Sequence, residues 1–274
     1  MKPKGEANLI KFVVSNQRGG VGKTTTATTL ARCFAERGMK TLLIDTDSQG
    51  SIQQILGIKP EYSLWDFLIG QIALKTCVVP IHPMIDVLCS DRRTMEAEDV
   101  ITSRMGREMT FEQAFGPQEG LYEAIVIDVA PSLNLFQTCA MMYTRHVLIP
   151  AAMDSLSAAG AASNFQAMDT INRMFKVEPP IKAIGLLPVI VDRRLQMTDL
   201  VLESLEGLSA RTGTPVFTPV RTDTAVVKAG RQRLFLSDYD PKSKALEDYN
   251  KVADQLLAEF KVTKENAADA LTNA

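Results

Sequence analysis

The 274-residue chain is poor in the residues that build metal centres and disulfide frameworks. It has two histidines and no C-x-x-C pair, and no histidine lies at ligand spacing from any of its four cysteines, Cys33, Cys77, Cys89 and Cys139. Structural zinc and a disulfide scaffold are therefore not expected. No apolar run approaches 18 residues and residues 1–8 hold no apolar signal segment, so we expect a soluble, cytoplasmic protein that does not engage a membrane.

The charge balance gives no global attraction to nucleic acid. Lysine and arginine together number 30 against 32 acidic residues, which leaves a net charge of −2. A DNA-binding face would have to be a local cationic patch. We find no internal repeat and no linker rich in proline or glycine. The simplest division is an N-terminal tail at residues 1–8, one domain at 9–260 and a C-terminal tail at 261–274.

Short apolar runs alternate with longer amphipathic ones along the domain, and this predicts an α/β fold: a doubly wound, mostly parallel sheet with helices on both faces. Strands are expected at 9–14, 41–45, 85–89, 124–129, 146–150 and 182–191. Pro188 favours an edge position for the last of these, or a bend near that point. Helices are expected at 27–37, 155–175, 197–211 and 243–260, with another after Pro60 in which Asp66 points outward.

The stretch Ser15–Thr26, SNQRGGVGKTTT, lies between a β-branched run and a helix-favouring run. A phosphate-binding loop requires this strand–loop–helix setting, with glycines that let backbone N–H groups approach a polyphosphate. Lys23 would reach the β- and γ-phosphates, and the Thr24 hydroxyl would bind Mg²⁺. The loop is a deviant form of the Walker A motif, because Gln17 stands where its first glycine belongs and Arg18 precedes the glycine pair. A plain glycine-rich turn with a surface lysine is the alternative.

Three aspartates follow predicted strands at the sheet edge where ligands bind in doubly wound folds. Asp45 and Asp47 end the second strand, and Asp128 ends the most apolar strand of the chain. One of the first pair could hold Mg²⁺ through a water while the other orients the attacking water. Asp128 has the position of a Walker B carboxylate. Two solvated turn residues and a strand-end cap are the respective alternatives.

Four ordered motifs, NQRGGVGKTTT, LLIDTDSQGS, IVIDVAPSLN and SDYDPKSKALEDY, resemble those of the ParA/Soj partition ATPases, within the wider group that includes MinD. The resemblance spans nearly the whole chain. It implies a P-loop fold that binds ATP and Mg²⁺ and hydrolyses ATP slowly, stimulated by a partner. It also implies an ATP-dependent homodimer that binds double-stranded DNA nonspecifically on the nucleoid. A ParB-like or other cargo adaptor would complete a system that segregates plasmids, chromosomes or another large cargo.

Transferred position by position, the resemblance assigns roles to several residues. It implies a catalytic set of Lys23, Asp47 and Arg18, and a metal set of Thr24, Asp128 and Asp45. Arg18 stands in place of the signature lysine that acts across the dimer, and we expect it to act in trans with altered hydrolysis rate or dimer lifetime. The residues implied to cradle the phosphates are Gly19, Gly20, Val21, Gly22, Lys23, Thr24 and Thr25.

The DNA surface is the least specific prediction from the sequence. Candidate cations lie after the predicted strand at 182–191 and in the C-terminal third, namely Arg194, Arg221, Lys228 and Arg231. Any one of them could instead be an ordinary solvated charge. Exposed methionine and leucine side chains around residues 95–115 are a candidate surface for the stimulating partner.

Three other classes share the loop chemistry. A MinD-like membrane ATPase is the nearest rival, but the C-terminal stretch carries little of the positive charge that a basic amphipathic anchor needs. An electron-transfer ATPase like the nitrogenase iron protein would need cluster-ligating cysteines, and the surroundings of Cys89 and Cys139 fit apolar packing better. A small-molecule synthetase of the dethiobiotin type would not need a cation before the glycine pair.

Overall fold

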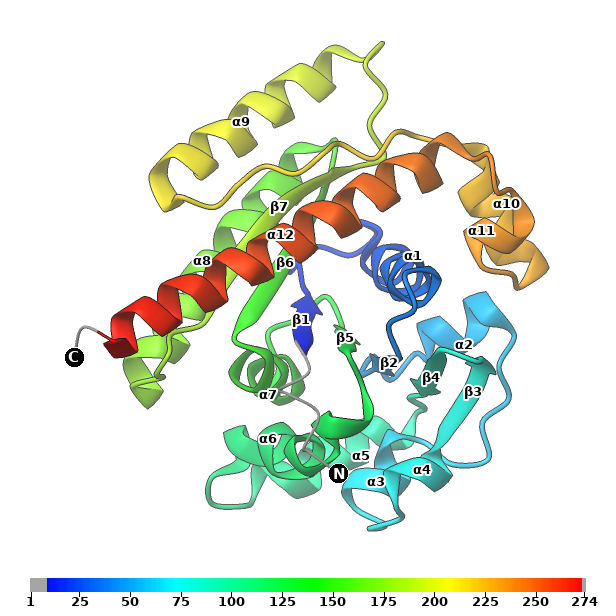
Figure 1. The fold of residues 1–274 in the computed structure, drawn as a ribbon, viewed down its shortest axis with the longest axis vertical. Coiled ribbons are helices and arrows are strands. Elements are labelled where there is room, and N and C mark those ends of the chain that lie inside the picture. The colour runs from blue at the N-terminus through cyan, green and yellow to red at the C-terminus, as the bar shows by residue number, and fades with distance from the viewer. Residues whose placement is uncertain (1–8, 273–274) are drawn as a thin grey trace.

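A seven-stranded sheet forms the centre of the molecule (Figure 1), in the order β3-β4-β2-β5-β1-β6-β7. The structure is a computed structural model that describes residues 9–272, without the side chains of residues 155 and 262–272. All neighbouring strands pair in parallel except β3 and β4. The strands are β1 (Ile10–Val14), β2 (Thr41–Asp45), β3 (Val78–His82), β4 (Ile85–Leu88), β5 (Ala124–Asp128), β6 (His146–Ala152) and β7 (Lys182–Val189).

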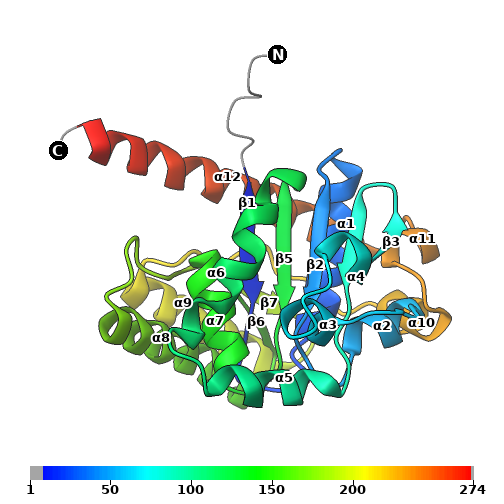
Figure 2. The same cartoon turned by 90° about the horizontal axis from the view of Figure 1, so that it is seen from below.

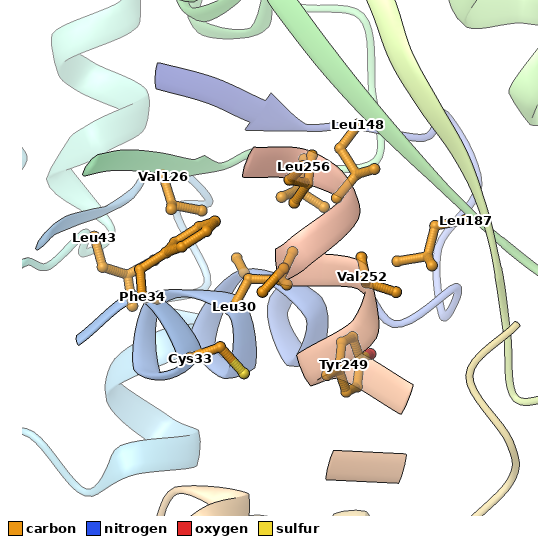
Figure 3. Packing of buried hydrophobic residues seen from close by; sticks show 14 of the residues in the cluster. Leu30, Cys33, Phe34, Leu43, Val126, Leu148, Leu187, Tyr249, Val252 and Leu256 are labelled. Atoms are coloured by element: carbon orange, nitrogen blue, oxygen red, sulfur yellow. The ribbon is translucent and has the colours of Figure 1, made fainter. Parts of the chain in front are cut away.

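Helices cover both faces of the sheet, which explains why the central strands are apolar on both sides. Successive residues of β1 serve different clusters: Phe12 and Val14 pack with α1 (Lys23–Glu36) and α12 (Lys244–Thr272), while Val13 packs with the opposite helices. Figure 3 shows the first cluster, in which side chains of α1 and α12 meet those of β2, β5, β6 and β7. The expected α/β fold with helices on both faces is confirmed.

The remaining helices divide between the two faces. The face that carries α1 and α12 also holds α2 (Ser51–Leu56), α10 (Thr224–Gln232) and α11 (Leu236–Tyr239). The other face is covered by α3 (Leu64–Leu68), α4 (Leu74–Cys77), α5 (Arg93–Thr102), η1 (Arg107–Met109), α6 (Thr110–Phe115), η2 (Gly116–Leu121), α7 (Leu135–Thr144), α8 (Ser155–Phe175) and α9 (Gln196–Thr212).

The parallel strands all end at one edge of the sheet (Figure 2). β1 lies between β5 and β6, so the loop after β1 leaves from the middle of that edge. The loops after β2, β5, β6 and β7 begin beside it. This arrangement brings stretches that are far apart in the sequence to one place, which is the usual position of a ligand site in open α/β sheets.

The predicted bounds of the second strand and of the 155–175 helix agree with β2 and α8. The strand that contains Pro188, β7, is at the edge of the sheet, as predicted. Strand β3 and helix α7 were not predicted. The last helix was expected to end at Phe260 and to leave a frayed tail, but α12 continues to Thr272. The predicted N-terminal tail, residues 1–8, lies outside the described residues.

Asp66 does not point outward as the sequence suggested. It is the N3 residue of α3 and is buried, and its carboxylate accepts hydrogen bonds from the backbone N–H of Ser63 at 2.8 Å and from Arg93 at 2.7 Å. The Ser63–Asp66 pair forms a capping box at the start of this short helix. The expectation failed because the cation that neutralises Asp66 comes from a residue 27 positions later in the chain.

Candidate nucleotide-binding site

The loop between β1 and α1 has the geometry of an anion-binding turn. Gly20 and Gly22 have positive φ values of 76° and 72°, which residues with a Cβ rarely adopt. Gly22 is also the N-cap of α1, and no side chain caps that helix. Its first N–H groups are therefore available to a ligand at the positive end of the helix dipole.

Lys23 is folded back onto this loop. Its side chain is buried, and its ammonium group donates to the carbonyl oxygens of Asn16 at 3.0 Å and Arg18 at 2.9 Å. Burial lowers the pKa of Lys23, and the nearby carboxylates of Asp128 and Asp47 oppose that shift. The lysine is thus held at the loop by weak neutral acceptors, which a phosphate oxygen would readily replace.

The carboxylates of Asp45 and Asp128 lie side by side but are bonded differently. Asp45 accepts hydrogen bonds from the backbone N–H groups of Asp47 at 2.9 Å and Ile52 at 3.0 Å, so its two oxygens fasten the loop after β2. Both oxygens of Asp128 are buried and make no hydrogen bond of full geometry within the described residues, although the Thr24 hydroxyl and the Val129 N–H lie close enough to favour its charged form. Burial raises the pKa of Asp128 to about 7, against the opposing effects of Thr24 and Lys23.

These unpaired oxygens fit the requirements of a hard divalent cation. Mg²⁺ prefers oxygen ligands, keeps several waters and is usually held by one or two protein groups together with phosphate oxygens. Thr24 and Asp128 are placed to supply such groups beside the glycine loop. Asp45, the third residue of the predicted metal set, has both oxygens occupied by backbone donors. Its effect on a cation would be through charge and loop position.

A cavity of about 480 Å³ opens from the loop and has the size of a small-ligand site. Its phosphate-loop end is lined by Gly19, Gly20, Gly22, Lys23, Thr24 and Thr25, with Asp47 and Pro131 opposite. Val21 is buried beneath the loop in the core. The predicted phosphate-loop residues and Asp47 therefore do come together around one space.

The sequence reading missed the other end of the cavity. That end is formed by the last residue of β7, by segments that follow β7 and by α12, namely Val189, Ile190, Val220, Arg221, Thr222, Asp223, Val226, Val227 and Tyr249. Its mixture of aliphatic walls and a few polar groups suits a flat heterocyclic ring. An apolar stretch next to the Thr-Asp-Thr start of α10 is a weak signal, and only the fold shows that it faces the phosphate loop.

The four predicted DNA-contacting cations lie in different settings. Arg194 is exposed and pairs with Asp192 in the same loop. Lys228 and Arg231 are exposed on α10, and no ion pair is found for either in the described part of the chain. Arg221 lines the cavity and is held by two carboxylates of α12, those of Asp248 and Glu247.

Arg18 is exposed beside the glycine pair, as its predicted role across a dimer requires. Its guanidinium group forms no ion pair within the described residues. It is near enough to the α8 N-cap residue Asp154 to help lower the pKa of that carboxyl, although hydrogen bonds from Ser157 contribute more. The cation is therefore available for another partner.

Comparison with known proteins supports the interpretation of this cavity as a nucleotide-binding site. Residues 10–180 match the model of a family described as an AAA domain. The chromosome partitioning protein ParA of Myxococcus xanthus is 28% identical over 93% of this chain and 90% of its own length, and the chromosome-partitioning ATPase Soj of Treponema pallidum is 26% identical over 90% and 96%.

Among solved structures, the cobyrinic acid a,c-diamide synthase of Mycobacterium smegmatis, with a bound ATP analog and magnesium, has a TM-score of 0.77 at 25% identity and covers 92% of this chain and 96% of its own. Structural likeness thus extends to a synthetase, whereas the two sequence relatives above are named as chromosome partitioning proteins. The chain belongs to the AAA domain family matched at residues 10–180 and, within it, to the ParA/Soj-type P-loop ATPases.

Proposed function

We propose that the protein is an ATP-driven switch that positions DNA or another large cargo. In this proposal it binds ATP and Mg²⁺, forms a homodimer around the nucleotide, and in that state binds double-stranded DNA without sequence preference in the nucleoid of the cytoplasm. A ParB-like or other adaptor stimulates its slow hydrolysis of ATP and releases it. The observation that carries the proposal is the unpartnered Asp128 carboxylate beside Lys23 and the uncapped start of α1.

The residues of the site account for the chemistry. Backbone N–H groups of residues 19–25 bind the phosphates, and Lys23 exchanges its carbonyl partners for phosphate oxygens. Thr24 and Asp128 would hold Mg²⁺, which when bound would supply positive charge that stabilises the phosphates. Asp47, which lines the cavity, orients the attacking water. Arg18 of one protomer supplies a cation to the nucleotide of the other.

The dimer also explains how DNA binding could follow the nucleotide. Arg194, Lys228 and Arg231 are exposed cations, so each protomer neutralises only about two or three phosphates. Pairing doubles that number, and the slope of log K against log salt steepens from roughly −2 to about −5. ATP would then control DNA affinity without a change in any single contact.

The test is binding of the purified protein to random-sequence duplex DNA with Mg·ATP, Mg·ADP or no nucleotide at two salt concentrations. An Asp47→Ala variant should retain ATP without hydrolysing it and stay bound. Binding only with ATP, weakened steeply by salt, is the expected result. ATP hydrolysis without DNA binding in any state would reject the partition role and favour a synthetase or a membrane ATPase.

The MinD-like alternative has less support. Relatives that match this chain over nine-tenths of its length are named as chromosome partitioning proteins. Among the described residues, no helix is long and apolar enough to cross a membrane. Binding of the ATP form to anionic vesicles but not to DNA would reverse this preference.

A further inference from the structure

Asn16 joins three elements at the root of the phosphate loop. Its side chain is fully buried. The amide nitrogen donates to the carbonyl oxygens of Pro150 in β6 at 2.7 Å and Ser157 in α8 at 3.3 Å. The amide oxygen accepts a hydrogen bond from the backbone N–H of Arg18 at 2.9 Å. One side chain thus ties the turn that carries Arg18 to a strand and a helix.

Gly160 in α8 provides the space for this contact. A Cβ atom at position 160 would lie 2.3 Å from the amide oxygen of Asn16 and 3.2 Å from the Cβ of Arg18. Glycine within a helix is destabilising relative to alanine. The glycine is explained by the close approach of α8 to the turn, because any side chain there would displace Asn16.

Both cations of the loop depend on the same turn. The backbone N–H of Arg18 is held by Asn16, and the ammonium group of Lys23 is bound by the carbonyl oxygens of Asn16 and Arg18. The directions of these carbonyls follow from the turn that the Asn16 side chain closes. The side chain itself is not part of the cavity lining.

We propose that Asn16 is a positioning residue that sets the places of Arg18 and Lys23. Gly160 is needed because it leaves the space that the Asn16 side chain occupies. The role of Asn16 in ATP turnover rests on the proposed function, whereas its hydrogen bonds to the loop do not depend on that function. A displacement of a reacting group by about 1 Å can reduce a rate by about a hundredfold. A residue that never meets the nucleotide can therefore control its hydrolysis.

A double-mutant cycle on the full chain separates positioning from general structural support. Asn16→Ala, Arg18→Ala and the double variant are compared by kcat, KM and the Kd of a fluorescent ATP analogue. We expect Asn16→Ala to lower kcat by about tenfold or more in the parent, and by less when Arg18 is already absent, because only the displacement of Lys23 then remains. Equal effects in both backgrounds would overturn the proposal.

A second readout does not require ATP. Trypsin cleaves after arginine, so release of the turn should speed cleavage of the Arg18–Gly19 bond by about tenfold or more in Asn16→Ala. Unchanged cleavage at this bond would overturn the proposal even if the kinetics changed. Faster cleavage in a protein that binds no ATP analogue would instead reject the proposed function and keep the positioning role.

Matched controls exist within the chain. Asn172, in the same helix as Gly160, makes two hydrogen bonds with the backbone of Ile181 at 2.9 and 2.8 Å. Asn172→Ala should therefore lower the Tm without changing kcat or the cleavage after Arg18. Gly160→Ala should reproduce Asn16→Ala. Gly207→Ala should not, because its Cβ would meet only the Arg211 side chain at 3.6 Å.

Discussion

Asp45 and Asp128 are register partners on the adjacent parallel strands β2 and β5, and only Asp45 has its carboxylate oxygens hydrogen-bonded. This difference in hydrogen bonding gives the two aspartates different roles, which cannot be told apart from the sequence alone. Asp45 holds the loop that presents Asp47. Asp128 keeps its oxygens free at the phosphate loop, at a cost in folding free energy because a buried, unpartnered carboxylate is poorly solvated.

Asp128→Asn should therefore change activity and stability in opposite directions. Loss of the charge should lower Mg²⁺-dependent ATP hydrolysis by roughly a hundredfold or more. The same change should raise the free energy of unfolding without nucleotide at pH 8 by about 1–3 kcal/mol, because the pKa of Asp128 is raised to about 7 and its charged form is disfavoured. Phosphate release and urea unfolding measure the two effects.

Asp45→Asn is the matched control for that experiment. It replaces one acceptor of a backbone N–H by a donor, which should cost about 1–3 kcal/mol in unfolding free energy. Burial and the neighbouring Asp128 also raise the pKa of Asp45 well above its usual range, so removal of its charge offsets part of this loss. If both variants destabilise the protein equally, the distinction between the two carboxylates is wrong.

Arg221→Ala should act on stability and nucleotide affinity more than on DNA binding. Asp248 is 3% exposed and would lose the guanidinium group that donates to its two oxygens at 2.7 Å each. We expect a loss of unfolding free energy, moderated because Arg221 itself is partly solvated. Weaker binding of a fluorescent ATP analogue should accompany it, since Arg221 lines the cavity.

Lys228→Ala and Arg231→Ala should show the contrasting behaviour. Each should reduce the salt slope of DNA binding by about two units, because the substitution removes one cation from each protomer of the dimer. Unfolding should be almost unchanged, because neither side chain is ion-paired in the described part of the chain. Electrophoretic mobility shifts with Mg·ATP over a series of salt concentrations measure the slopes. If Arg221→Ala reduced the salt slope and the Lys228 and Arg231 variants did not, Arg221 would be the DNA-contacting residue instead.

His146 should make stability depend on pH. Burial lowers its pKa to about 4, and its ring packs on Phe260 with centroids 4.8 Å apart. The unfolded chain protonates near pH 6.5 and the folded one near pH 4, so this contribution is complete above pH 6.5 and declines as the pH falls toward 4. The loss reaches at most about 3 kcal/mol.

The comparison of parent and His146→Gln isolates this effect from the carboxylates, several of which titrate in the same range. Urea unfolding at pH 7.5 and 5.0 should show a larger decrease for the parent than for the variant. His82→Gln, which removes the other histidine of the chain, should retain most of the decrease. An equal pH response in the parent and His146→Gln would contradict the assignment.

Asp66→Ala should destabilise the protein by about 1–2 kcal/mol, because the capping box of α3 and the partner of Arg93 are lost together. The pKa of Asp66 is lowered by Arg93 and by the Ser63 N–H despite some burial. Its contribution is therefore present above the ordinary carboxyl pKa and is lost as the pH falls through the lower folded value. Denaturant unfolding at pH 7 and pH 3 compares the two conditions.

Most of the fold could be predicted from local sequence patterns. The β-branched runs located β2 and most of the parallel strands, and Pro188 placed β7 at an edge. Strand β3 was missed because Val78–His82 includes a proline and is only partly buried, as suits an antiparallel edge. Helix α7 was missed because its sequence, LFQTCAMMYT, is almost wholly buried and shows little amphipathic pattern.

The site was predictable where it depends on one stretch and not where distant stretches meet. The glycine loop with Lys23 can be read locally. The cavity end at Val220 and Tyr249, and the ion pair of Arg221 with Asp248, depend on how α12 packs against β7 and α1. The contact of Gly160 with Asn16 is of the same kind, since the two residues are 144 positions apart.

The position of β1 inside the sheet has a consequence for protein motion. Because β1 pairs with β5 on one side and β6 on the other, its amide protons should exchange with solvent only when the whole domain opens. The edge strands β3 and β7 can separate at lower free energy. The phosphate loop thus extends from an interior strand, so we expect any rearrangement on nucleotide binding to be confined to the few residues between Val14 and Lys23.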